Sequence, residues 1–159
     1  MVVIHISDRY RERAAWLVKP VQLAIHSTVH SSEAGDGDVI EQQLEGFFEE
    51  REQYWVLKYK EGSPDSSDDV NTTVKAGKDE AIVIRQGVVN YRQTYRLDQK
   101  TYSRIEIPGG VSETEVETLE YDRKRSEVEG QVRLSFRLAM GGEAMGSYLL
   151  NIKWTEVTA

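Results

Sequence analysis

Apolar and polar residues alternate along most of the chain from residue 21 onward, and this period of two indicates β-strands that bury one face. The clearest strands are predicted over residues 131–140 and 143–155, with further strands over 21–30, 39–49 and 53–60. The apolar residues that share one face of the two clearest strands are Val132, Leu134, Phe136, Leu138 and Met140, then Tyr148, Leu150, Ile152 and Trp154. The whole pattern predicts about ten strands, with these two apolar rows in the core.

Short segments that contain glycine separate the alternating runs. Three of them, Gly77-Lys78, Gln86-Gly87 and Gly141-Gly142, have the length of a two-residue hairpin and supply a glycine for a positive φ. Pro108-Gly109-Gly110 marks another tight turn. Such connections are too short for parallel crossovers, so neighbouring strands should be antiparallel. A long meander has two free edges, and it removes them by closing into an up-and-down β-barrel, here of about eight to ten strands.

The first 19 residues do not share this pattern. Residues 8–18 are rich in Arg, Glu and Ala, which predicts a short helix or an irregular segment that begins at Ser7 or Asp8. We expect Trp16 of this segment to pack on one end of the barrel. The length of 159 residues suits one domain. We therefore expect an N-terminal extension over residues 1–19 and an all-β barrel domain over residues 20–159.

Composition limits the classes of function. The chain has no cysteine, which excludes disulfides, thiolate nucleophiles and cysteine-bound metals. It has no apolar run as long as a membrane span and no secretory signal, so we expect a cytoplasmic protein without a membrane partner. The net charge of −7 repels phosphate backbones, so we expect no nucleic-acid partner. Acidic neighbours offset the basic run Arg123-Lys124-Arg125, which we interpret as a solvated turn.

Several stretches of the chain stand out by their order and spacing: Leu44-Glu45-Gly46, Asn71-Thr72-Thr73-Val74-Lys75, Ile82-Val83-Ile84-Arg85-Gln86-Gly87, Arg92 to Leu97, Met140-Gly141-Gly142 and Gly146-Ser147-Tyr148. In these stretches the chain resembles the YwiB-like family, a group of uncharacterised bacterial proteins with a calycin-like (lipocalin-related) β-barrel. The resemblance covers residues 21–156 and implies the calycin-like barrel, with residues 1–19 before its usual start. It implies no activity. The lipocalin Gly-x-Trp motif is absent, so lipid transport is not carried over.

Candidate metal ligands do not combine into a site. His26 and His30 would lie about 13 Å apart on one strand, because a strand rises about 3.3 Å per residue. That separation is too large for two ligands of one zinc ion. The acidic segments 35–38 and 65–69 lack the spacing of a calcium-binding loop, and we interpret them as acidic turns. We therefore expect neither a metal nor another cofactor.

Three glutamates form the one pattern that suggests catalysis. Glu113, Glu115 and Glu117 alternate, so they share one strand face at about 6–7 Å between neighbours, a spacing compatible with paired acid–base chemistry. The same pattern places Leu119 and Tyr121 on their face. Three buried like charges would cost much free energy, so we expect the glutamates outside the barrel. We consider three classes of function, namely ligand binding, surface interaction and catalysis, and we rank catalysis last.

Ligand binding is the first of these classes. Arg85 ends an apolar run just before a turn, and Arg104 lies between Tyr102 and Glu106. An arginine at a barrel rim can bind an anionic head group. Tyr54, Tyr91 and Tyr148 are the candidate cavity-lining residues. We expect a partly filled interior with a small pocket near Arg85, which would take an apolar or amphiphilic molecule.

The second class is an accessory or interaction protein, whose barrel is filled by side chains and whose surface is functional. The oligomeric state, monomer or homodimer, stays open at this point.

Overall fold

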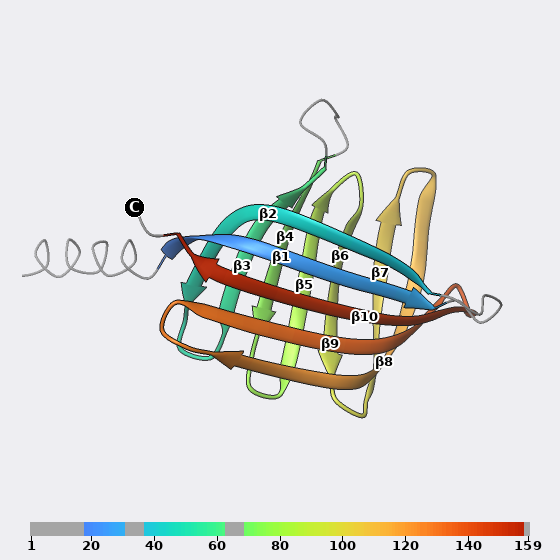
Figure 1. The fold of residues 1–159 in the computed structure, drawn as a ribbon. Helices are drawn as coiled ribbons and strands as arrows, with labels where there is room; N and C mark the ends of the chain where they lie inside the picture. The colour runs from blue at the N-terminus through green and yellow to red at the C-terminus, as the bar shows by residue number, and fades with distance from the viewer. Residues whose placement is uncertain (1–17, 31–36, 63–68, 158–159) are drawn as a thin grey trace, which may run out of the picture.

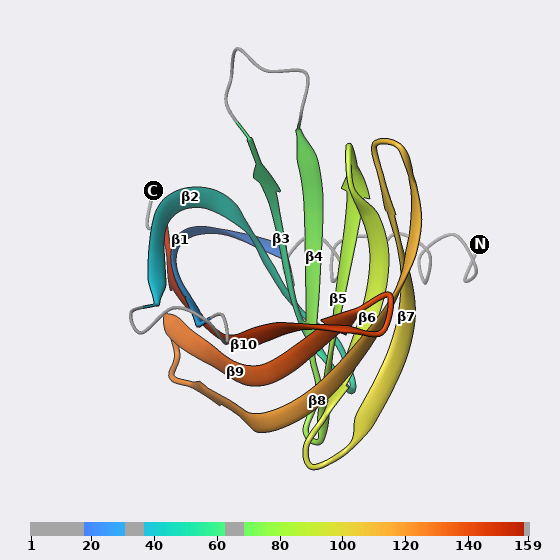
Figure 2. The same ribbon diagram turned by 90° about the vertical axis from the view of Figure 1, so that its right-hand side faces the viewer.

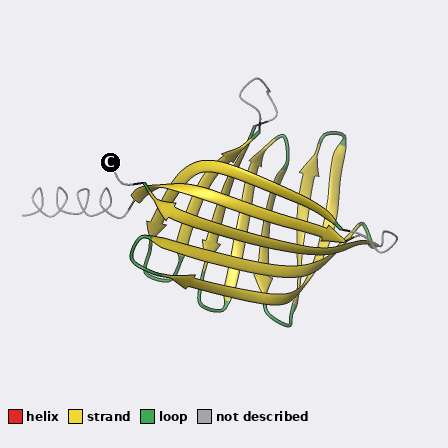
Figure 3. Cartoon of the chain, in the orientation of Figure 1, coloured by secondary structure: helices red, strands yellow, loops and turns green. Residues whose placement is uncertain are grey.

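The computed structural model describes residues 18–30, 37–62 and 69–157. Ten strands make up nearly all of this described structure (Figure 3). The predicted N-terminal helix and Trp16 lie outside the described residues. The strands are β1 (Val18–His30), β2 (Asp38–Glu50), β3 (Trp55–Glu61), β4 (Val70–Ala76), β5 (Glu80–Gly87), β6 (Asn90–Arg96), β7 (Lys100–Ile107), β8 (Gly110–Arg125), β9 (Glu129–Met140) and β10 (Glu143–Glu156).

Each strand pairs antiparallel with the next in sequence, and β1 pairs with both β2 and β10 to close the barrel. The predicted all-β, antiparallel, closed up-and-down barrel is therefore confirmed. The long strands β8, β9 and β10 cross the direction of β3, β4 and β5 steeply (Figures 1 and 2). No helix in the described part of the chain is both long and apolar enough to span a membrane.

The predicted glycines lie in or beside the turns, but two of the predicted connections need correction. Gln86 and Gly87 end β5, so the two residues that connect β5 to β6 are Val88 and Val89. Gly141 and Gly142 connect β9 to β10 with φ of 59° and 83°, the two positive values that a type I′ hairpin requires. Gly77 does not adopt a positive φ, so that part of its prediction is wrong. Its role is close packing, because a Cβ there would lie 3.0 Å from the ring of Tyr54. The β4–β5 connection also spans three residues rather than two.

The predicted apolar rows of β9 and β10 do form the core. Val132, Leu134 and Phe136 of β9 are buried, as are Ile152 and Trp154 of β10. Leu138, Tyr148 and Leu150 pack against this core and are partly buried. Because the two strands are paired in register, both rows lie on the inner wall.

A β-bulge in β8 changes which residues face inward. Thr118 pairs with Phe136, whereas Glu120 pairs with Ser135, so Leu119 is an extra residue without its own partner. Before the bulge the even-numbered residues face the interior, and after it the odd-numbered ones do. The prediction that Tyr121 shares a face with the three glutamates is therefore wrong: Tyr121 packs against the core.

The bulge also corrects the interpretation of Arg123-Lys124-Arg125 as a solvated turn. This run is the last part of β8, and two of its residues turn inward. The Arg123 guanidinium lies 4.2 Å from the Trp55 ring and donates a 2.8 Å hydrogen bond to the carbonyl of Ala76. The Arg125 guanidinium lies 4.7 Å from the Phe48 ring. Arg125 also pairs with Glu50 at 2.8 Å, and both guanidinium groups lie over aromatic rings of this end of the barrel.

Aromatic side chains fill this end of the barrel. Phe48 stacks on Trp154 with ring centroids 5.2 Å apart, and Trp55 meets Trp154 edge-on at 6.2 Å. We call the end that holds these three rings and the two arginines the filled end. The opposite end, where β5 turns into β6, is the cavity end.

Candidate functional site

A belt of side chains crosses one wall at the cavity end. Tyr59 of β3 pairs with Thr72 of β4, Thr72 with Arg85 of β5, Arg85 with Tyr91 of β6, and Tyr91 with Ile105 of β7. Directly paired residues of antiparallel strands project to the same face. All five side chains therefore point into the barrel, and the belt lies one to two residues inside the rim.

A cavity of about 380 Å³ lies against this belt and is open to solvent. Its volume falls within the range of about 300–1,000 Å³ that is usual for small-molecule sites. The apolar and aromatic side chains that line it include Val83, Tyr95, Val116, Phe136, Leu138, Met140, Tyr148 and Leu150. The expected small pocket near Arg85 is thus present in the structure.

Three aromatic rings form the inner wall. Phe136 stacks on Tyr148 with ring centroids 5.3 Å apart and an interplanar angle of 6°, and on its other side it contacts Tyr95 at 4.8 Å. Such offset ring contacts stabilise beyond the area that they bury. The three rings line the cavity and pack against the core.

Arg85 is the only cationic side chain among the described residues that line the cavity. Its Nη2 lies 3.4 Å from Oε1 of Glu61, and its guanidinium carbon lies 5.6 Å from the centroid of the Tyr91 ring. Its Nε is buried and has no hydrogen-bond partner among the described residues. Burial alone would lower the pKa of Arg85, but the nearby Tyr91, Glu61, Tyr59 and Tyr95 raise it, and the pKa ends above its usual value. Arg85 is therefore a permanent positive charge at the mouth.

The phenols around Arg85 stay protonated. Burial raises the pKa of Tyr59, and the nearby Glu61 carboxylate adds to this rise more than Arg85 opposes it. Burial likewise raises the pKa values of Tyr91 and Tyr95. At neutral pH these hydroxyls are uncharged, and each can donate a hydrogen bond.

Three of the five predicted ligand-binding residues come together at this cavity: Arg85, Tyr91 and Tyr148. Arg104 does not. Alternation along β7 turns Ile105 inward and leaves Arg104 exposed on the outer face, beside Arg92 and Glu106.

Tyr54 also lies elsewhere. It precedes β3 at the filled end, where its hydroxyl donates to Glu80 at 3.4 Å. Tyr59, Tyr95 and Gln93 also line the cavity and were not predicted from the sequence. The alternation of Tyr91, Gln93 and Tyr95 along β6 is the signal that places the last two beside Tyr91 on one face.

The three glutamates lie on the outer face of β8, as expected. Thr114, Val116 and Thr118, between and after them, are buried. Glu115 accepts a hydrogen bond from the Tyr102 hydroxyl at 3.2 Å, and Glu117 lies 3.4 Å from Nη1 of Arg137. These contacts make the glutamates part of the outer surface, away from the cavity.

The candidate metal ligands are dispersed. Nδ1 of His26 lies 3.2 Å from Glu41, and His30 is exposed at the end of β1. Most of the acidic segments 35–38 and 65–69 lies outside the described residues, whereas the described Asp69 pairs with Lys60 at 2.9 Å. Within residues 18–30, 37–62 and 69–157, no three His, Asp or Glu side chains gather as a metal site would require.

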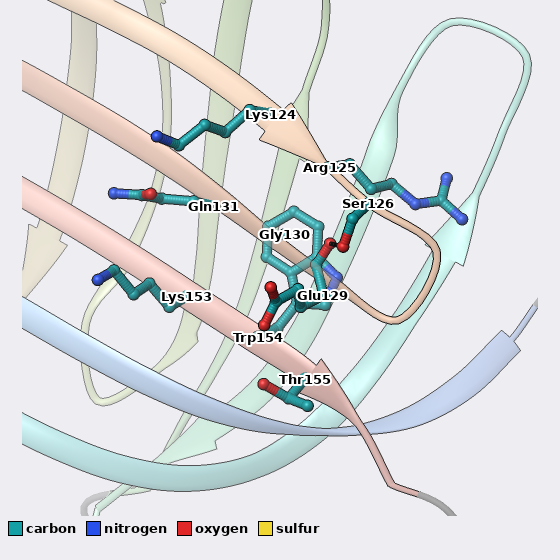
Figure 4. Close-up of a pocket in the computed structure, with 9 residues that line it drawn as sticks. All are labelled: Lys124, Arg125, Ser126, Glu129, Gly130, Gln131, Lys153, Trp154 and Thr155. Carbon is teal, nitrogen blue, oxygen red and sulfur yellow. Dashed lines mark hydrogen bonds between the residues drawn. The ribbon is translucent and has the colours of Figure 1, made fainter.

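A second hollow, of about 440 Å³, lies over the β8–β9 turn on the outside of the barrel (Figure 4). Lys124, Gln131 and Lys153 stand on its outer rim, and the indole of Trp154 lies beneath Gly130. A Cβ on Gly130 would come within 2.1 Å of that ring. The glycine therefore serves the packing of the core, and the charged donors among the described residues that line the hollow are Lys124, Arg125 and Lys153.

The comparisons with known proteins agree on the fold. The profile of a family described as "Domain of unknown function (DUF1934)" matches residues 24–152. The "Uncharacterized beta-barrel protein YwiB" of Bacillus subtilis (strain 168) is 24% identical over 124 residues, which are 78% of this chain and 84% of that protein. The crystal structure of the ywiB protein from Bacillus subtilis matches with a TM-score of 0.79 at 21% identity, over 94% of this chain and 99% of that one. The predicted family resemblance and the β-barrel are both confirmed.

Proposed function

Since the chain belongs to the DUF1934 family of β-barrel proteins, a membership that names no activity, we propose from its cavity that it binds a small amphiphilic molecule at the open end of the barrel. The single observation that carries the proposal is an apolar, partly aromatic cavity of about 380 Å³ with one partly buried cationic side chain, that of Arg85, at its mouth. Convergence of a few polar groups on an apolar cavity is the usual form of a ligand site.

The polar groups of the cavity are arranged for recognition rather than for chemistry. Gln93 is held by three hydrogen bonds, to the carbonyl of Thr94 at 3.1 Å, to Thr101 at 3.1 Å and from Thr114 at 2.8 Å. No nucleophile–base pair lines the cavity among the described residues, and the carboxylates of β8 face outward. Binding, without turnover, is the function that this set of side chains supports. In this proposal the barrel holds the ligand in its interior, as a calycin-like barrel does.

Surface interaction is the alternative class. Val39, Ile40 and Phe47 of β2 are exposed apolar residues. Single exposed apolar residues are common on protein surfaces and need no functional explanation. An open cavity inside the barrel, by contrast, does not contribute to stability. The cavity therefore favours ligand binding over an accessory role.

The test fills the cavity. Leu138→Trp places an indole in the space where Leu138 now forms part of the wall, and Val128→Trp places the same group on an exposed turn as the matched control. Binding of 1-aminoanthracene, a small neutral fluorophore, is measured by its emission. We expect about tenfold weaker binding by the Leu138→Trp variant and unchanged binding by the control, because only the first blocks the cavity. Equal binding by wild type and both variants, with unchanged circular dichroism, would contradict the proposal.

A further inference from the structure

The polar groups at the cavity mouth are mostly donors. The Arg85 guanidinium carries five N–H groups, and only one of them has a described acceptor, Glu61 at 3.4 Å, which is long for a charged hydrogen bond. The buried Nε has no partner among the described residues, and neither has the Oγ1 of Thr72, which is paired with Arg85 across the strands. A buried donor without an acceptor costs free energy that an incoming acceptor can return.

Acceptors are scarce at the same place. Among the described residues, Glu61 is the one carboxylate in contact with Arg85, and none of them lines the cavity with a carboxylate. The hydroxyls of Tyr59 and Tyr91 stay protonated beside the guanidinium, for the reasons given above. A cationic ligand would meet Arg85 with no opposing charge deeper in the barrel. An anionic head group would instead find one arginine and neutral donors.

The geometry points to an amphiphilic monocarboxylate as the ligand: we propose that Arg85 holds its carboxylate at the mouth while its apolar tail lies against Phe136, Tyr148 and Leu138. This inference rests on the proposed function and adds the chemical class of the ligand. One arginine already shared with Glu61 fits a single negative charge better than a phosphate dianion. Two carboxylates then compete for one guanidinium, so Glu61 limits the affinity.

The cavity volume sets the size of the ligand. One water molecule occupies about 30 Å³ in the liquid, and a methylene group is of similar size, so 380 Å³ holds about a dozen non-hydrogen atoms. A saturated acid of about ten carbons, or an aromatic acid of that size, fills this space.

The experiment compares decanoate with 1-decanol, which share a tail and differ in charge. Displacement of 1-aminoanthracene gives the affinity of each for wild type and for Arg85→Met, Glu61→Gln and Arg104→Met. Arg104→Met is the matched control, because it removes an arginine from the outer face of β7, two strands away from β5. Thermal unfolding confirms that each variant is folded.

We expect wild type to prefer decanoate over 1-decanol by about tenfold or more, the usual effect of a hydrogen bond to a charged group. Arg85→Met should abolish the preference and change 1-decanol binding by less than about twofold. Glu61→Gln should strengthen decanoate binding alone, a gain that misfolding cannot imitate, and Arg104→Met should behave as wild type.

Two results would overturn the inference while leaving the proposed function intact: equal binding of the two ligands by wild type, or a decanoate preference that survives in Arg85→Met. The proposed function fails as well if neither ligand displaces the fluorophore and the fluorophore binds weakly, with the same affinity for wild type and for the Leu138→Trp variant.

Discussion

Single residues in this barrel act according to the face on which they lie. Arg85 and Arg104 have the same side chain and lie at nearly the same level along the barrel wall, yet Arg85 lies at the cavity mouth and Arg104 is exposed to solvent. Phe136 shows a further consequence, because it belongs both to the core and to the cavity wall. Its ring contacts Tyr95 on one side and Tyr148 on the other, so it links the filled interior to the open space.

Replacing Phe136 tests this double role. We expect Phe136→Ala to lower the free energy of unfolding by about 3 kcal/mol, the lower end of the usual range for a buried phenylalanine. The reason for the lower end is that the ring already borders a cavity, so part of its surface has no protein neighbour to lose. Urea denaturation followed by tryptophan fluorescence measures the change.

A loss below about 1 kcal/mol would show instead that Phe136 is a lining residue of an open pocket rather than core. Binding of 1-aminoanthracene by the same variant then separates the two roles, since a lining residue affects binding more than stability.

Elements in this chain are defined by their turns as much as by their strands. The hairpin between β9 and β10 has only two connecting residues, Gly141 and Gly142, both with positive φ. The next irregularity follows at once, because the register shifts between Ala144 and Gly146. The turn and the bulge together set which residues of β10 meet the apolar row of β9.

Substitutions in this hairpin should differ in cost. Gly142→Val should lower the free energy of unfolding by about 1–2 kcal/mol, because a branched side chain is strained in the left-handed region. Gly141→Asn should be nearly neutral, since asparagine is favoured at the first position of a type I′ turn. Thermal unfolding of the two variants provides the measurement, and each serves as the other's control. Equal losses for both variants would argue against this turn geometry.

The whole barrel is closed but not uniformly hydrogen-bonded. Strands β6 and β7 share only two paired positions, Asn90 with Glu106 and Tyr91 with Ile105. Further along, side chains replace the backbone ladder: the hydroxyls of Thr101 and Ser103 donate to the carbonyls of Thr94 and Arg92. Strand β2 pairs with β3 only over residues 46–50, so among the described residues its first half has a partner on one side alone.

These weak seams predict where the barrel opens. We expect the amides of β6 and of residues 38–45 that face the seams to exchange with solvent faster than those of β9, which is paired along both sides. Hydrogen exchange measured by NMR resolves individual amides and provides the test. Uniform protection of all ten strands would contradict the expectation and would indicate a barrel that opens only by global unfolding.

The sequence by itself determined the strands, their antiparallel order and the inward rows of β9 and β10. These are local properties: a period of two marks a half-buried strand, and a short glycine turn can join only antiparallel neighbours. For the same reason the sequence indicates that Tyr91 and Tyr148 share the inner face of their strands. Arg85 is selected differently, as the residue that ends an apolar run just before a turn.

Only the tertiary structure decided the rest. The bulge at Leu119 is a feature of the pairing between β8 and β9 rather than of the sequence of β8 alone. It turns Tyr121, Arg123 and Arg125 inward. The separation of a filled end from a cavity end, with Tyr54 at the first and Arg85 at the second, depends on which rings stack across the closed barrel. Such contacts join residues far apart in sequence, and no local pattern carries them, because their geometry arises when the strands close on one another.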